Sequence, residues 1–288
     1  MTDARRIVWL ASYPKSGNTW LRSFLAKYFT PKHDQLDINT LRRFTTGDVR
    51  ADFFERASGR SPFKAADFDE WLMLRQKALH LIAVSKPQPH FVKTHCMVDR
   101  IGPYPLIPPQ VTAAAIYLVR NPFDVAQSYA RHLGYSLDDT VALMENPKGI
   151  NRTAANIFEV LGRWDDHVAS WTRARGLARH VMRYEDMVAD PERAFRDLLA
   201  FLKAPVNDGK LRRALRETSF EALRQEEAKK GFIERPGHMD AFFAKGRAGS
   251  WREELSAEQV ARLRASFLPT LEEWYPEMLA ETAEAAGA

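Results

Sequence analysis

Short apolar stretches alternate along this chain with segments whose apolar residues recur at helical spacing. Residues 7–12 and 113–119 are continuous apolar runs, and residues 90–94 and 180–184 also have the character of strands. The helical spacing predicts helices, the clearest of them over residues 67–84, 123–133, 155–175, 190–203, 209–217 and 220–229. This alternation predicts an α/β fold, with a central parallel sheet flanked by helices on both faces.

We expect one domain over residues 1–288, with a tail that frays after about residue 279, because no linker or internal repeat interrupts the pattern. Ligands of such sheets bind beyond the carboxyl ends of the strands. The residues that follow the four predicted strands are therefore the candidates for chemistry.

The segment YPKSGNTW at residues 13–20 follows the first strand and precedes a helical pattern. A tight loop at this point directs backbone N–H groups and the positive end of a helix dipole at one spot, which suits a phosphate or a sulfate. The segment resembles a P-loop, but Ser12 stands at the first glycine position and Asn18 at the lysine position. Its lysine is Lys15, inside the loop. The alternative is an ordinary strand-to-helix connection.

Lys93, Thr94 and His95 end the second strand. A neutral imidazole beside a substrate hydroxyl can act as a general base, although a histidine that bonds a backbone carbonyl is an equally ordinary interpretation. Neighbouring strand residues point to opposite faces, so Cys96 should not pair with His95 and is expected to be a small buried residue.

Arg120 ends the third strand, where its planar fork could hold a phosphate, and Ser128 lies two turns into the next helix. Asp124, Ser128 and His132 share one helical face and imitate a hydrolase triad. One straight helix cannot bring these groups together around an oxyanion hole, and the chain has no G-x-S-x-G elbow, so we reject that interpretation.

The fourth strand ends at Tyr184, followed by Glu185 and Asp186. The two acids could bind a metal, but we favour a structural role for them. Tyr184 could contact an adenine or pack in the core. Farther on, residues 245–252 carry three cations among two glycines, which fits either a loop that folds over a polyanion or a solvated basic loop.

Composition narrows the choice of partner. The net charge of +5 over 288 residues suits a polyanionic ligand and is weak for a nucleic-acid binder. Cys96 is the single cysteine, so the chain can form neither an intrachain disulfide nor a cysteine metal cluster. The apolar runs are too short to cross a bilayer or to form the core of a signal peptide. We therefore expect a cytoplasmic protein with no membrane span.

Together these segments resemble the cytosolic-type sulfotransferases that use 3′-phosphoadenosine-5′-phosphosulfate (PAPS). The matching motifs are Y-P-K-S-G-[TN]-T-W at Tyr13–Trp20, K-T-H at Lys93–His95, R-N-P-x-D-x-x-x-S at Arg120–Ser128, Y-E-D at Tyr184–Asp186 and R-K-G-x-x-G-x-W at Ala244–Trp251. The resemblance spans nearly the whole chain and implies a sulfotransferase fold similar to that of P-loop NTPases.

The resemblance also implies the roles of individual residues. It makes His95 the general base and Lys15 the residue that stabilises the leaving phosphate, with Lys93 near the sulfuryl oxygens. The residues that would bind PAPS are Lys15, Ser16, Gly17, Asn18, Thr19 and Trp20 in the first loop, Arg120 and Ser128 at the 3′-phosphate, Tyr184 and Thr218 near adenine, and Lys245 and Gly246 in the late loop. Ser128 is thus counted with the catalytic group as well. No metal is implied, because cations and helix N–H groups suffice for sulfuryl transfer.

Three positions depart from the family pattern. Ala244 replaces the usual arginine before Lys245, a loss that Arg247 could compensate, and Ser250 replaces an aspartate before Trp251. The sequence after Trp251 does not match the K-x-x-x-T-V pattern of the family's dimer motif. The predicted oligomeric state is therefore left open.

We predict transfer of a sulfuryl group from PAPS to a hydroxyl of a small-molecule acceptor. The alternatives are a nucleotide or small-molecule kinase and a non-catalytic nucleotide-binding protein. Asn18 in place of the P-loop lysine argues against the kinase. Aromatic residues in the segments expected to face the acceptor suggest an acceptor with an apolar or aromatic body, although they could equally belong to the core: Phe44, Phe53, Phe54, Tyr104, Tyr135 and Phe158.

Overall fold

The computed structural model describes residues 6–31 and 37–287 of the chain, which divides into two compact units. The first unit consists of Met1–Tyr13, Thr45–Tyr117 and Asn146–Val181, and the second consists of Pro14–Phe44, Leu118–Glu145 and Met182–Ala288. Each unit thus combines three separate stretches of the chain. That the chain forms a single domain stays a prediction.

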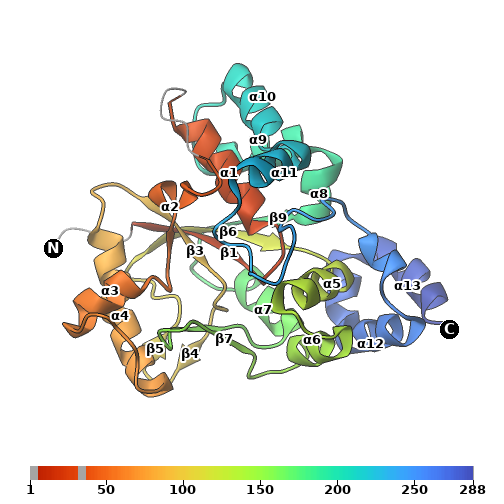
Figure 1. Cartoon of the computed structure of the whole chain (residues 1–288), viewed down its shortest axis with the longest axis horizontal. Helices are drawn as coiled ribbons and strands as arrows, with labels where there is room; N and C mark the ends of the chain where they lie inside the picture. The colour runs from red at the N-terminus through yellow and green to blue at the C-terminus, as the bar shows by residue number, and fades with distance from the viewer. Residues whose placement is uncertain (1–5, 32–36, 288) are drawn as a thin grey trace. The chain divides into compact units, whose positions relative to one another are not determined.

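A five-stranded sheet has the strand order β2-β3-β1-β6-β9 and lies mainly in the first unit. Its strands are β1 (Ile7–Ser12), β2 (Thr46–Gly47), β3 (His90–Thr94), β6 (Thr112–Val119) and β9 (Arg179–Arg183). Strand β3 runs parallel to both β1 and β2, and Ile7 lies opposite His90 at the start of the β1–β3 register. Figure 1 shows β1 and β3 side by side, with β1 in red.

Burial explains why these stretches became strands. Every residue of β1 except Val8 is buried, and so are the last five residues of β6. A strand that is covered on both faces requires a continuous apolar run rather than an alternating one. The predicted central parallel sheet flanked by helices is confirmed.

The first unit also contains three helices and two small antiparallel ribbons. Its helices are α3 (Ala51–Ser58), α4 (Phe68–Val84) and α7 (Trp164–Thr172). One ribbon pairs β4 (Arg100–Ile101) with β5 (Tyr104–Pro105), and the other pairs β7 (Ile150–Arg152) with β8 (Phe158–Val160). The Asp67 side chain accepts from Glu70 N and fixes the start of α4 at its predicted place.

The predicted single helix over residues 155–175 is wrong. Asn156 and Gly162 have φ values of +52° and +63°, which a helix cannot accommodate. Strand β8 pairs instead with β7, with Ile150 opposite Val160, and α7 begins only at Trp164. The cross-strand pairing overrides the helical periodicity of the sequence at this point.

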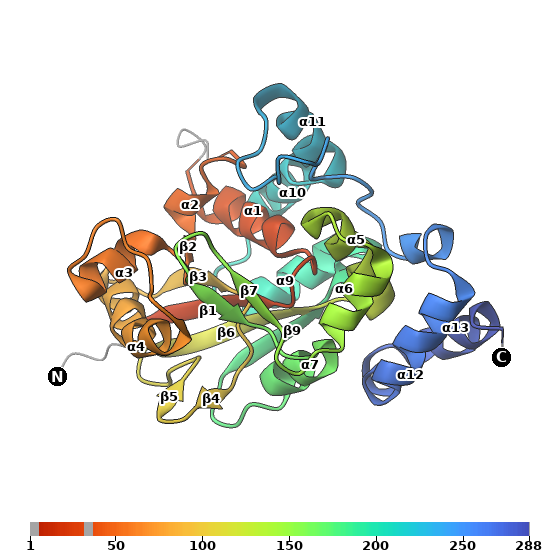
Figure 2. The same cartoon turned by 60° about the horizontal axis from the view of Figure 1, so that its bottom comes forward.

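The second unit is helical. Its helices are α1 (Asn18–Phe29), α2 (Leu41–Phe44), α5 (Pro122–Leu133), α6 (Leu137–Met144), α8 (Tyr184–Ala189), α9 (Pro191–Phe201), α10 (Asp208–Glu217), α11 (Phe220–Lys230), α12 (Ala257–Trp274) and α13 (Leu279–Ala285), with 3₁₀ turns η1 (Ser250–Glu253) and η2 (Pro276–Met278). Figure 2 shows α5 beside α6, and α12 beside α13. The tail after residue 279 forms α13, and its fraying stays a prediction.

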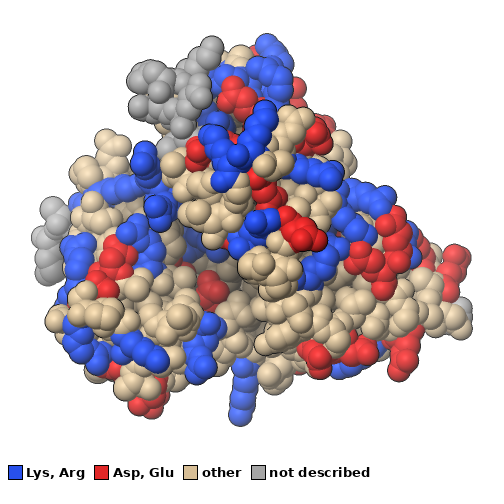
Figure 3. Space-filling view, in the orientation of Figure 1, with Lys and Arg blue, Asp and Glu red and all other residues tan. Residues whose placement is uncertain are grey.

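Side-chain caps explain several of these helix starts. Asn121 caps α5 by accepting from Asp124 N, and Pro122 occupies the first helical position. Ser256 and Gln259 form a reciprocal capping box at α12. Figure 3 shows several acidic side chains over α12 and α13, and Glu281 of α13 pairs with Arg252 of η1.

Within the described ranges, no helix has both the length and the apolar character that a membrane crossing requires.

Candidate active site

The loop between β1 and α1 has two residues in the left-handed conformation. Lys15 has a φ of +66° and Gly17 one of +97°. Gly17 is the N-cap residue of the helix that begins at Asn18, and this helix start has no side-chain cap. A Cβ atom at Gly17 would lie 2.7 Å from the Tyr184 ring, so the position needs glycine for both backbone and packing reasons. A helix N-terminus of this kind favours an anionic ligand.

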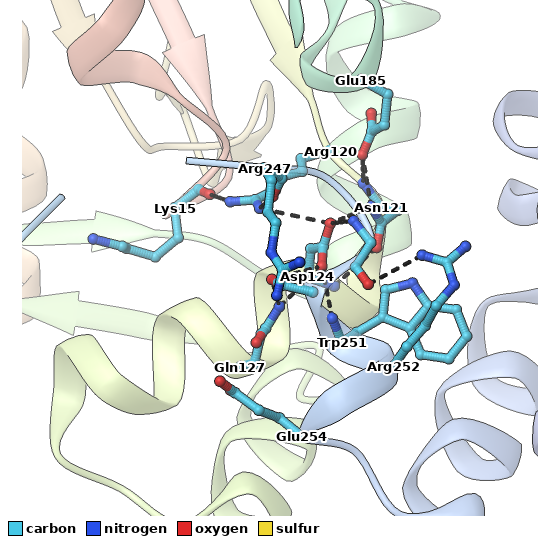
Figure 4. A network of polar contacts seen from close by, with 12 residues as sticks. Lys15, Arg120, Asn121, Asp124, Gln127, Glu185, Arg247, Trp251, Arg252 and Glu254 are labelled. Carbon is cyan, nitrogen blue, oxygen red and sulfur yellow. Dashed lines mark hydrogen bonds and ion pairs between the residues drawn. The ribbon is translucent and has the colours of Figure 1, made fainter. Parts of the chain in front are cut away.

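Arg120, directly after β6, joins this loop to the late loop, which we define as residues 244–251. Its side chain is only 10% exposed. Its guanidinium donates to the Lys15 carbonyl at 3.1 Å and to the Arg247 carbonyl at 3.3 Å (Figure 4). The guanidinium carbon also lies 4.2 Å from the centre of the Tyr184 ring. The structure therefore brings together three segments that the sequence marked separately.

Some buried polar groups of these segments have no hydrogen-bond partner among the described residues. They include Oγ of Ser16, a fully buried residue, and Nε of Arg120. Buried polar atoms of proteins are almost always bonded, so an unbonded pair in a cationic loop requires a physical explanation. A phosphate or sulfate oxygen is an acceptor that suits both groups.

The late loop is held by two glutamates that follow it in the sequence. Lys245 Nζ lies 3.4 Å from a carboxylate oxygen of Glu253 and also pairs with Glu254, and Arg247 pairs with Glu253. Gly246 has a φ of +62°, and a Cβ there would collide with the Phe220 ring at 2.0 Å. The side chain of Arg247 thus forms an ion pair at the surface. That Arg247 compensates for the arginine missing at position 244 stays a prediction.

Trp20 lies among aromatic rings on the same unit. Its ring centre is 6.1 Å from that of Tyr184 and 5.6 Å from that of Phe195, both in edge-on arrangements. Its indole N–H is buried and has no acceptor within the described part of the chain. Thr218 is fully buried, and its hydroxyl donates to the Ala214 carbonyl at 2.8 Å. The hydroxyl of Thr218 therefore bonds to the last turn of α10. The place of Thr218 beside adenine stays a prediction.

The remaining predicted binding residues lie on α1 and α5. Asn18 is buried, and Thr19 accepts a hydrogen bond of 3.2 Å from Arg22. The same arginine makes two bonds, of 2.9 and 2.7 Å, to the Glu234 carboxylate. Ser128 is half-buried on α5, as predicted from its spacing.

Lys93 and His95 lie at the end of β3 in the first unit. His95 is 9% exposed, and its Nδ1 is 2.7 Å from the carbonyl oxygen of Ser12. A carbonyl oxygen can only accept, so Nδ1 carries the proton and Nε2 is the basic nitrogen of the ring. The lysine is half-buried, and its carbonyl accepts from Asp48 N at 3.1 Å.

A second histidine, His167, makes a hydrogen bond to the backbone of His95. His167 is fully buried, and its Nε2 lies 3.1 Å from the His95 carbonyl, to which it must donate. Its Nδ1 then accepts from the Tyr117 hydroxyl at 3.0 Å. The pKa of His167 is lowered to about 3, mainly by burial and also by the nearby His95 ring, against the opposing hydrogen bond to the His95 carbonyl. The ring is therefore neutral at physiological pH and has a structural role.

Cys96 is a buried residue, as predicted. Burial raises the pKa of its thiol to about 12, and its backbone N–H donates to the Thr94 hydroxyl at 3.0 Å. Trp171 Nε1 donates to its carbonyl at 3.1 Å. A thiol with so high a pKa is a poor nucleophile at neutral pH.

Of the two acids after the fourth strand, Glu185 makes the structural contacts that we favoured. Glu185 accepts from the backbone and side-chain nitrogens of Asn121, at 3.1 and 2.6 Å, and from the Tyr275 hydroxyl at 3.2 Å. Burial raises the pKa of its carboxyl. Residues 6–31 and 37–287 contain no cluster of three His, Cys, Asp or Glu side chains that could hold a metal.

The aromatic residues expected near the acceptor differ in their surroundings. Phe53 and Phe54 are buried in the first unit, where Phe54 stacks on Phe63 with a centre-to-centre distance of 5.4 Å. Phe158 packs edge-on against Trp71 at 5.5 Å. Two of the expected acceptor aromatics are thus core residues.

Asp124, the carboxylate at the centre of the polar contacts in Figure 4, received no role from the sequence. It was considered in the rejected triad and is the aspartate of the R-N-P-x-D-x-x-x-S motif. The available signal was the spacing of four between Arg120 and Asp124, which puts a negative charge in the first turn of α5 close to the arginine that precedes the helix.

The central parallel sheet and the loop between β1 and α1 place the protein in the P-loop-like fold class. A model of the sulfotransferase domain matches residues 5–275, so the chain belongs to the sulfotransferase family. The protein is a PAPS-dependent sulfotransferase, as its motifs implied, and the kinase alternative fails.

Known relatives agree with this assignment. The chain is 26% identical to human sulfotransferase 1C2 over 88% of this chain and 79% of the relative, and 23% identical to rabbit amine sulfotransferase over 90% and 79%. The fold is similar to that of a mouse sulfotransferase complexed with PAP, with a TM-score of 0.59, 20% identity and coverage of 98% and 90%. It is also similar to retinol dehydratase in complex with androsterone and PAP, with a TM-score of 0.64, 20% identity and coverage of 95% and 84%.

Proposed function

We propose that the protein transfers the sulfuryl group of PAPS to a hydroxyl, an alcohol or a phenol, of a small-molecule acceptor by in-line displacement. The observation that carries this proposal is the pair of buried, unbonded groups on Ser16 and Arg120, next to Lys15 in a cationic loop. PAPS supplies a sulfuryl group attached to a phosphate that leaves as PAP, the 3′-phosphorylated adenosine 5′-phosphate. Family membership supports the same donor.

The donor-binding roles follow the family motifs. Backbone N–H groups of residues 16–19 hold the 5′-phosphate at the start of α1, and Arg120 and Ser128 hold the 3′-phosphate. Trp20, Tyr184 and Thr218 contact adenine. Lys245 and Gly246 cover the nucleotide from the late loop.

The chemical roles belong to two lysines and one histidine. His95 Nε2 accepts the proton of the acceptor hydroxyl while the oxygen–sulfur bond forms. The bond from sulfur to the bridging phosphate oxygen breaks, and Lys15 stabilises the charge that develops on that oxygen. Lys93 stabilises the sulfuryl oxygens. The hydrogen bond from His95 Nδ1 to Ser12 supports the role of the histidine, because it fixes the tautomer that a base requires.

The decisive experiment is an acceptor screen with isotopically labelled PAPS. Panels of alcohols, phenols and amines with aromatic or aliphatic bodies are incubated with the protein, and sulfated products are identified by mass spectrometry. We expect hydroxyl acceptors with apolar bodies to be sulfated. A parallel reaction in EDTA should give the same rate, because the proposed mechanism draws its positive charge from side chains.

The other outcomes of the screen would decide against parts of the proposal. Sulfation of amines alone would contradict a hydroxyl acceptor and would indicate an amine acceptor, as in the name of the rabbit amine sulfotransferase. Tight binding of PAP without transfer to any acceptor in the panels would favour a non-catalytic nucleotide-binding protein. A rate that disappears in EDTA would contradict a mechanism that draws its positive charge from side chains.

A further inference from the structure

Asp124 is a fully buried carboxylate at the centre of the polar network in Figure 4. It lies in the first turn of α5 and accepts from groups on two separate segments of the chain. Its donors are Asn121 Nδ2 at 3.0 Å, Gln127 Nε2 at 2.9 Å, Gly249 N at 2.8 Å, Ser250 Oγ at 3.3 Å and Trp251 N at 3.1 Å. This one side chain therefore ties the end of the late loop to helix α5.

The charge of Asp124 persists at neutral pH. Burial by itself would raise the pKa of its carboxyl, but Arg120, the Asn121 side chain and the N–H groups of Gly249 and Trp251 together hold that pKa below its usual range. Five donors satisfy the two carboxylate oxygens, as a buried charge requires. Their number leaves little acceptor capacity for a further direct bond.

Arg120 is close to this carboxylate but not bonded to it. Its nearest nitrogen lies 3.6 Å from Asp124 Oδ2, beyond the usual length of a hydrogen bond. Its own donors face the carbonyl oxygens of Lys15 and Arg247, and Nε has no partner among the described residues. The carboxylate thus balances the buried guanidinium without occupying the donors that an anion would use.

We propose that Asp124 is a positioning residue for the 3′-phosphate: it holds the Arg120 guanidinium in place and fixes Gly249–Trp251, so that Lys245 and Gly246 close over the nucleotide. It does not touch the substrate itself. The inference rests on the proposed function, in which Arg120 binds the 3′-phosphate. A purely structural role would give the same contacts, so the test must separate nucleotide discrimination from folding.

Asp124→Asn keeps the size of the side chain and removes its charge. We expect it to weaken PAP binding about 10–100-fold, the usual effect of removing the partner that orients a binding group. The affinity for adenosine 5′-phosphate, which lacks the 3′-phosphate, should stay within about twofold. Isothermal titration with the two nucleotides measures this ratio, and thermal unfolding measures the stability of each variant.

Asp48→Asn is the matched control. Asp48 is also buried and pairs with an arginine, Arg75, at 2.7 Å, but it lies in the first unit. This variant should lose stability while it keeps the wild-type ratio of the two affinities. A double-mutant cycle with Arg120→Gln tests whether Asp124 acts through Arg120. Once Arg120 is gone, Asp124→Asn should cause no further loss of discrimination between the two nucleotides.

The outcomes distinguish a failure of the proposed function from a failure of the positioning role alone. If the wild type binds PAP no better than adenosine 5′-phosphate, the proposed function and the positioning role both fail. If the wild type discriminates and Asp124→Asn discriminates equally well, only the positioning role fails. Should Asp124→Asn not fold, Ser250→Ala replaces it, and PAP affinity must fall by about two- to tenfold, the effect of losing one long hydrogen bond. An unchanged PAP affinity in Ser250→Ala would then overturn the role.

Discussion

Lys15 combines two features that an ordinary loop lysine does not have. Its backbone is left-handed, with its carbonyl bound by Arg120, and its Nζ lies 3.9 Å above the centre of the Phe242 ring. The ring face attracts the ammonium and limits the directions that it can take. A positive charge held in this way, in a loop whose P-loop lysine position is Asn18, fits charge stabilisation of a leaving group.

Lys15→Ala should therefore reduce turnover more than nucleotide affinity. We expect kcat to fall about 10²–10³-fold, the usual weight of a group that stabilises developing charge, with PAP affinity changed only a fewfold. Steady-state kinetics and PAP titration check the two numbers. Lys203→Ala is the matched control, because Lys203 is an exposed lysine with a similar φ of +53°. Equal losses in kcat and affinity for Lys15→Ala would contradict the assigned role.

His95→Ala should reduce kcat about 10²–10⁴-fold, the usual contribution of a positioned general base. The reason is the tautomer: the Ser12 carbonyl holds the proton on Nδ1, which leaves Nε2 as the base. Turnover with the best acceptor of the screen measures the effect, and the exposed histidine His80 on α4 provides the control variant His80→Ala. Near-wild-type turnover in His95→Ala would require another base.

At the scale of elements, glycines specify the start of α1 and the late loop in the same way. Gly17 and Gly246 both have positive φ, and both are packed so closely against an aromatic ring that a methyl group would collide. The left-handed conformation alone explains glycine at many helix ends. The collisions with Tyr184 and Phe220, in contrast, occur in elements to which we assign nucleotide binding. Backbone geometry and ring packing therefore act together there.

Gly17→Ala tests this combination. The left-handed φ should cost about 1–2 kcal/mol of unfolding free energy, and the collision with Tyr184 should add about 1–3 kcal/mol and weaken PAP binding. Gly59→Ala is the matched control, since Gly59 has a φ of +74° at the end of α3 and nothing within 4 Å of the added Cβ. It should show the first cost alone. Chemical denaturation and PAP titration measure both effects, and equal losses in the two variants would refute the packing contribution.

At the scale of the whole molecule, acid stability should depend on His167. Its folded pKa of about 3 lies below the unfolded value of 6.5, so the unfolded chain takes up the proton first as the pH falls. Stability from the neutral ring is fully present above pH 6.5 and is lost between that pH and about 3. The slope in this window reaches about 1.4 kcal/mol per pH unit.

His167→Gln should flatten that slope, whatever its effect on stability at pH 7. Denaturant unfolding at several pH values between 4 and 6.5 measures the difference between variant and wild type. His80→Gln, at an exposed position of α4 in the same unit, should keep the wild-type slope. A wild-type slope in His167→Gln would show that other groups govern acid unfolding.

The sequence by itself determined β1, β3, β6 and β9, most helices and the family, but did not predict β2 of the central sheet. Buried strands require continuous apolar runs, and caps such as Asp67 and Asn121 act within one turn of chain, so both signals are local. The phosphate loop was predicted for the same reason: its glycine, its lysine and the helix that follows are neighbours in sequence.

Only the tertiary structure decided the rest. The pairing of β8 with the neighbouring strand β7 replaced the first part of a predicted helix, because backbone hydrogen bonds between the two strands outweigh the helical periodicity. The bonds of Asp124 to residues 125 to 127 positions away along the chain have no signature in composition or spacing. Partners so distant in sequence are set by how the chain packs, and the positioning of Arg120 depends on those partners.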